Sequence, residues 1–195
     1  MVRVLALSLC LLPACGGADG PDDPLGPVDI STMALTFVPR GGGEAATFRW
    51  DDPAGVDEPT VEDIRIDGDV NYDLSVGFLH DGRDVTPEIV NEAEEYQLFF
   101  TGVSVESDAT GDNPFAVVGV AYDDIDRRAL PIGLNARVTT LSTGNGTFTV
   151  TVRHMPREND VFVKDEGMAE LVASRGFDAL PGETAISVDF LMRVE

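Results

Sequence analysis

The stretch Val70–Phe78, VNYDLSVGF, decides the fold class, because apolar and polar side chains alternate along its whole length. Successive side chains of a β-strand point to opposite faces, so this stretch has one apolar and one polar face. We therefore expect a strand with one face on a hydrophobic core and the other in solvent. The apolar face consists of Val70, Tyr72, Leu74, Val76 and Phe78, and His80 continues it by one step.

The same alternation recurs on both sides of this strand. Ile30–Val38 alternates in the same way, and the loop Arg40–Gly43 separates it from the β-rich segment Glu44–Trp50, which predicts a hairpin. Asn145-Gly146 predicts a second hairpin, because these residue types adopt the positive φ angles of tight turns. Further strands are expected at Val61–Ile66, Gln97–Val105, Phe115–Tyr122, Leu134–Leu141, Thr147–His154 and Ile186–Val194.

The segment Thr86–Tyr96 breaks the strand pattern and predicts a short helix. Thr86 suits the N-cap and Pro87 suits the first helical position. Apolar side chains follow at helical spacing and are expected to pack on the β-structure. These side chains are Ile89, Val90, Ala93 and Tyr96.

The segment Asp165–Gly176 predicts a second helix that ends at Gly176, since glycine commonly follows the last helical residue. The side chains expected to face inward are Met168, Leu171 and Val172. Taken together, the segments predict a mainly β protein. The architecture is an antiparallel β-sandwich or open barrel of about eight to nine strands with one or two short helices.

The N-terminal segment Met1–Cys15 predicts export. Arg3 supplies a positive charge, Val4–Leu12 is apolar, and Leu12-Pro13-Ala14-Cys15 closes the segment. This tetrapeptide resembles the lipobox of bacterial lipoproteins. The resemblance implies that residues 1–14 are a lipoprotein signal peptide and that Cys15 carries the lipid, which makes the membrane a partner. Gly16, rather than aspartate, after the cysteine favours the outer membrane.

The domain organisation follows from this segment. Residues 15–28 comprise the lipidated cysteine and a flexible linker of Gly, Pro and Asp, and residues 29–195 are expected to form a single β-sandwich domain. A plain secretory signal or an uncleaved anchor is the alternative reading of the N-terminus. Val4–Leu12 is, however, far shorter than the roughly 20 residues that cross a bilayer.

The net charge of the chain limits its possible binding partners, and its two cysteines limit its possible disulfides. The chain has 13 Lys+Arg against 35 Asp+Glu, a net charge of −22, which repels nucleic acid and anionic lipid. We interpret this acidity as a solvated surface, with a cation-binding role as the alternative. Cys10 lies in the signal peptide and Cys15 would carry lipid, so no disulfide is expected.

The body of the chain resembles a family of small uncharacterised bacterial lipoproteins. The resemblance rests on GGGEAATFRW at residues 41–50, the acidic turn after it, EAEE at 92–95 ahead of QLFF at 97–100, and VRH at 152–154. Some members carry the label of a type 1 periplasmic-binding fold. That fold needs two α/β lobes and about twice this length, whereas this chain has strand periodicity.

Acidic turns are candidate calcium sites, because calcium binds carboxylate and carbonyl oxygens. The candidates are Asp51, Asp52, Asp57 and Glu58, then Asp67 and Asp69, and finally Asp123, Asp124 and Asp126; none has EF-hand spacing. No other cofactor is expected. A zinc or copper site would have to combine His80 or His154 with carboxylates. Plain acidic turns and strand-end histidines are the competing interpretation.

The sequence lacks the motifs of common catalytic sites, including G-x-S-x-G, H-E-x-x-H and the P-loop. We expect a non-catalytic, lipid-anchored binding or accessory protein of the outer membrane. Its expected partners, beyond the membrane, are an outer-membrane transporter or a surface polymer. The alternatives are a secreted hydrolase of glycosidase type that uses an acidic pair, or a purely structural envelope lipoprotein.

Overall fold

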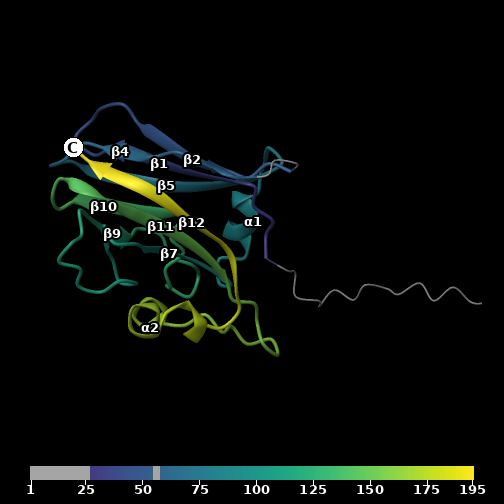
Figure 1. Cartoon of the computed structure of the whole chain (residues 1–195). Coiled ribbons are helices and arrows are strands. Elements are labelled where there is room, and N and C mark those ends of the chain that lie inside the picture. Colours follow the sequence, from purple (N-terminus) through teal and green to yellow (C-terminus); the bar gives the residue numbers. More distant parts are fainter. Residues whose placement is uncertain (1–26, 55–57) are drawn as a thin grey trace, which may run out of the picture.

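The computed structural model describes residues 27–54 and 58–195, which form two β-sheets and two short helices (Figure 1). The mainly β prediction with few helices is confirmed. The larger sheet has the order β3-β2-β1-β5-β10-β9-β8, with β6 also paired to β5, and the smaller has the order β4-β12-β11-β7. The predicted signal peptide, residues 1–14, lies outside the described residues, as do Cys15 and most of the predicted linker.

The strands of the larger sheet are β1 Thr32–Pro39, β2 Ala46–Asp51, β3 Thr60–Val61, β5 Asn71–His80, β6 Arg83–Asp84, β8 Val105–Glu106, β9 Val118–Tyr122 and β10 Asn135–Thr140. Those of the smaller sheet are β4 Ile64–Ile66, β7 Tyr96–Thr101, β11 Gly144–His154 and β12 Glu183–Val194. The helices are α1 Thr86–Asn91 and α2 Met168–Arg175, and a 3-10 turn follows at Phe177–Ala179.

Strand β5 is a central strand of the larger sheet, as its alternation suggests. It pairs antiparallel with β1 on one side and with β10 on the other. Its apolar residues from Tyr72 to Phe78 are buried, while the residues between them are exposed or half-buried. Most other pairs are also antiparallel, but β4 runs parallel to β12 and β8 parallel to β9.

The two sheets share one hydrophobic core. Phe37 of β1 lies 6.3 Å from Phe148 of β11, measured between ring centroids, and Phe148 lies 5.8 Å from Phe100 of β7. All three rings are buried. Because each buried side chain of this size stabilises the fold by about 1.5 to 3 kcal/mol, this contact between sheets is a major part of the stability.

The predicted hairpin at Asn145-Gly146 is wrong. Both residues lie inside β11, and the chain passes from β10 in one sheet to β11 in the other. Gly146 is required by close packing, since a Cβ at this position would lie 2.5 Å from the Cβ of Ser104. In the sequence alone, a glycine that allows two segments to pack closely cannot be distinguished from a glycine in a turn, which is why the hairpin prediction failed.

Helix α1 is shorter than predicted. It ends at Asn91, and Tyr96 begins β7 opposite His154 of β11. Thr86 is not the N-cap; its Oγ1 instead accepts a hydrogen bond of 2.9 Å from the Phe78 N–H, which ties the helix to β5. Ile89 is buried as predicted, whereas Val90 is 51% exposed.

Helix α2 lies within the predicted segment, and Gly176 follows its last residue with a φ of 78°. Ala169 and Val172 pack with Phe99 of β7 in a second, smaller core. Because Phe99 and Phe100 point to opposite faces of β7, α2 covers the face of the smaller sheet that turns away from the main core. No helix in the described part of the chain is long and apolar enough to cross a membrane.

Candidate functional site

The predicted calcium residues near β2 have separate surroundings. Asp51 Oδ1 accepts a hydrogen bond of 2.7 Å from Thr32 Oγ1, and the Asp52 N–H donates to the Ser31 carbonyl at 2.8 Å. Asp57 lies outside the described residues. The role of this turn in calcium binding therefore stays a prediction.

Asp123 and Asp124 stabilise the loops around β9 and β10. Asp123 pairs with Arg137, while Asp124 accepts backbone hydrogen bonds from Gly133 at 2.8 Å and from Asn135 at 2.9 Å. Among residues 27–54 and 58–195, no group of three or more His, Cys, Asp or Glu side chains is arranged to hold a metal ion. Asp123 Oδ1 and both carboxylate oxygens of Asp124 thus accept hydrogen bonds from protein donors.

Asp126 belongs to a buried ion pair with Lys164, the single lysine of the chain. The Lys164 ammonium lies 2.9 Å from Asp126 Oδ2 and donates to the carbonyls of Ala93 and Tyr96, both at 2.8 Å. All three of its N–H donors therefore have acceptors. Burial opposes ionisation of Asp126, but hydrogen bonds from the Leu130 N–H and from Lys164 outweigh it and lower the Asp126 pKa. Sequence reasoning missed Lys164, because its partners come from distant segments.

The two histidines do not share a site. His80 is half-buried at the end of β5 and lies 3.7 Å from Asp81. His154 is buried and stacks on Tyr96 with 4.6 Å between ring centroids. Burial lowers the His154 pKa, although Glu95 and Glu183 oppose the shift. The stacked, buried position of His154 is that of a core residue.

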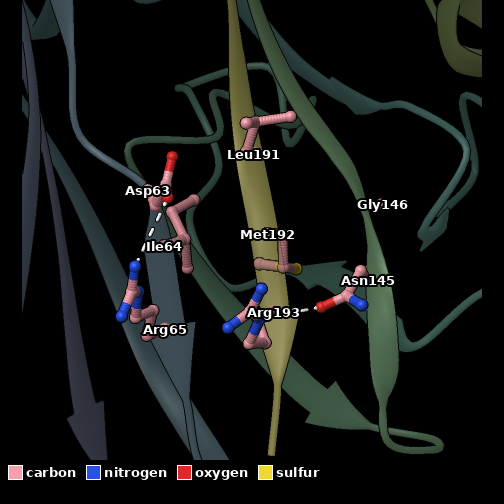
Figure 2. A pocket seen from close by; sticks show the side chains of 8 residues that line it. All are labelled: Asp63, Ile64, Arg65, Asn145, Gly146, Leu191, Met192 and Arg193. Carbon is pink, nitrogen blue, oxygen red and sulfur yellow. Dashed lines mark hydrogen bonds and ion pairs between the residues drawn. The ribbon is translucent and has the colours of Figure 1, made fainter.

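A small hollow lies on the smaller sheet where β4, β12 and β11 run side by side (Figure 2). Its volume is about 230 Å³, and its polar side chains are Arg65, Arg193, Asn145 and the carboxylate Asp63. Arg193 Nε donates a hydrogen bond of 2.9 Å to Asn145 Oδ1. The hollow thus presents two guanidinium groups on an otherwise acidic protein.

A larger groove, of about 600 Å³, crosses the outer face of the larger sheet at β9 and β10. We call it the acidic groove. Gly119–Ala121, Arg137, Thr139 and Leu141 line it from the sheet, and Arg137 pairs with Asp123. Four carboxylates line it as well, and none of them pairs with a described cation: Glu106, Asp108, Asp112 and Glu170.

Three large apolar side chains lie exposed on the segments that form the acidic groove or adjoin it. Phe115 is 82% exposed, Val103 67% and Leu141 50%. Asn113 links two of these segments, because its Oδ1 accepts from the Phe115 N–H at 3.1 Å and its Nδ2 donates to the Val103 carbonyl at 3.2 Å. The Leu141 N–H donates to the Val117 carbonyl at 2.8 Å. Of the three, Leu141 lines the groove itself, and Val103 and Phe115 lie on segments that adjoin it; we call Val103, Phe115 and Leu141 the apolar rim.

The sequence did not predict the acidic groove, because its residues come from separate segments: the loop after β8, strands β9 and β10, and helix α2. Only Phe115 gave a local signal, as the first residue of a predicted strand that in fact begins at Val118. The fold and the site together are those of a two-sheet β protein with an acidic groove on the outer face of its larger sheet. Comparison with family models, with curated proteins and with solved structures finds no match.

Proposed function

We propose that this chain is a lipid-anchored, non-catalytic binding or accessory protein of the bacterial outer membrane. The acidic groove with its apolar rim is the single observation that carries the binding function. Its partner is a basic segment of another envelope protein, such as an outer-membrane transporter, that offers an apolar side chain between cations. The anchor rests on the likeness of Leu12–Cys15 to a lipobox.

Exposure of the apolar rim supports a docking role. Single exposed apolar residues are common, but several large ones beside a groove are typical of interaction surfaces. The unpaired carboxylates of the groove repel one another, and a cationic partner would relieve this repulsion. Charge complementarity of this kind also increases the rate of association.

The position of the groove fits a tethered protein. Thr32 lies opposite Leu79 at one end of β5, and Thr139 of the groove lies opposite Asn71 at the other end. A strand rises about 3.3 Å per residue, so the two ends are about 26 Å apart. The described chain begins at Pro27, and its first residues lie beside α1. Figure 1 shows α1 at the end of the sheets remote from the C-terminus. A lipid on Cys15 would therefore join the domain at the end opposite the groove.

Site-specific photo-crosslinking in intact cells tests this function. Benzoylphenylalanine in place of Phe115 should give a discrete adduct, and the same amino acid in place of Val161, which is 64% exposed elsewhere, should not. Adding Glu106→Gln and Asp112→Asn should weaken the adduct at position 115, because the cationic partner loses its acceptors. Identical adducts at both positions, or an adduct insensitive to the charge changes, would contradict docking at the groove.

A further inference from the structure

Two arginines stand side by side in the hollow on the smaller sheet. Strands β4 and β12 are parallel, and Arg65 is in register with Arg193. Neighbouring strands are about 4.8 Å apart, so the two side chains leave the sheet from adjacent positions. Figure 2 shows them on adjacent strands, with Arg65 turned toward Asp63 and Arg193 hydrogen-bonded to Asn145.

This arrangement is electrostatically unfavourable by itself. Like charges at directly opposed positions of neighbouring strands destabilise a sheet. The chain has only 13 Lys+Arg against 35 Asp+Glu, so an arginine of this protein is expected to lie beside a carboxylate more often than beside a second cation. Nearby anions therefore stabilise this pair of arginines.

The carboxylates nearby compensate only loosely. Arg65 Nη2 lies 3.5 Å from Asp63 Oδ2, and Arg193 Nη1 lies 3.7 Å from Glu195 Oε1. Charge-assisted hydrogen bonds between such groups are about 2.7 to 2.9 Å long. Both arginine side chains are also more than half exposed. Their outer N–H groups thus remain available to a ligand.

Asn145 orients one side of the hollow. Its Oδ1 accepts from Arg193 Nε at 2.9 Å, which holds the guanidinium in place and leaves the Asn145 amide nitrogen as a further donor. Leu191, which is 62% exposed, lines the hollow as an apolar neighbour. At about 230 Å³ the hollow suits one small group rather than a drug-sized molecule.

We propose that this hollow binds an oxyanion, a carboxylate or phosphate group, between Arg65 and Arg193. Guanidinium groups bind both anions through paired, parallel hydrogen bonds. Asn145 contributes a further hydrogen bond, and Leu191 contacts the apolar part of the ligand. The site lies on the smaller sheet, so it is independent of the acidic groove and of the function proposed for it.

Titration followed by NMR of the arginine Nε–H signals tests the site in the folded protein with Cys15 changed to Ser. The probes are sodium acetate and sodium phosphate, with sodium chloride at matched ionic strength as the control for screening. We expect a saturable shift of the Arg193 signal with acetate, with phosphate or with both. The anion whose titration saturates at the lower concentration is the one that the site prefers.

Two variants make the outcome decisive. Arg65→Gln should weaken binding at least about tenfold, which corresponds to the loss of one good contact. Arg40→Gln removes an arginine of similar exposure that pairs with Asp73 on the other sheet, and it should leave binding unchanged. Shifts that follow ionic strength alone, or equal effects of the two variants, would overturn the proposal. An unchanged melting temperature shows that each variant is folded.

Discussion

Lys164 shows how much a single residue can depend on its surroundings. Its ammonium is buried, and it joins the segment after β11 to Asp126 and to the turn before β7. Desolvation of two charges offsets much of their attraction, so such a pair contributes less to stability than its short distance suggests. Removing one partner is different, because the other charge stays buried without compensation.

Lys164→Met should therefore destabilise the protein by about 3 to 5 kcal/mol. The double change Lys164→Met with Asp126→Asn should recover part of this loss, because it removes the uncompensated charge and keeps an Oδ1 acceptor for the Leu130 N–H. Urea unfolding of both variants measures the difference. Arg40→Gln is the matched control, because it breaks an exposed pair with Asp73 and should cost about 1 kcal/mol or less. A cost of Lys164→Met as small as that of the control would argue against a buried charge.

His154 predicts a pH dependence of stability. Burial lowers its pKa in the folded protein below the ordinary value of 6.5. Between the two pKa values the unfolded chain binds more protons, so stability rises with pH in that interval. The contribution of neutral His154 is complete above pH 6.5 and declines as the pH falls toward the folded-state pKa.

His154→Phe keeps an aromatic ring on Tyr96 and removes the titration. Unfolding free energies of the parent and the variant, measured by urea denaturation across this range, should converge or cross on acidification, because only the parent loses stability through this group. Parallel curves would show that His154 does not titrate differently in the folded and unfolded states.

At the scale of elements, α1 tests which helical face is buried. Ile89 is fully buried and Val90, next to it, is 51% exposed. Ile89→Ala should cost about 2 to 4 kcal/mol, whereas Val90→Ala should change the free energy of unfolding by only about 0.5 kcal/mol. Urea unfolding of the two variants decides, and a similar cost for both would mean that the helix is rotated from the position described.

The elements also show where local patterns stop being informative. Alternation predicted β5 and β1 well, because a strand between core and solvent has period two. Helical spacing extended the first predicted helix to Tyr96, but Tyr96 is held in β7 opposite His154. The strand prediction also included Phe115, although that ring is exposed and lies outside β9.

At the scale of the whole molecule, the proposed anchor can be separated from the described fold. Cys15→Ser should move the protein from the membrane fraction to the periplasmic fraction or the medium, because no other residue of the segment accepts the lipid. Cys10→Ser is the matched control and should leave the protein with the membrane. Cell fractionation with a salt wash measures both. Persistent membrane association of the Cys15 variant would contradict lipidation at this residue.

The sequence by itself determined the mainly β class, most strand positions and the location of two helices, because these depend on side-chain periodicity within single segments. The sequence also predicted the hairpin of β1 and β2, whereas the tertiary structure alone decided how the other strands are divided between the two sheets and that β4 pairs with β12. The tertiary structure also placed Lys164 on Asp126 and Arg65 beside Arg193. These contacts join residues far apart in the chain, and their register is set by the packing of the whole core rather than by any local pattern.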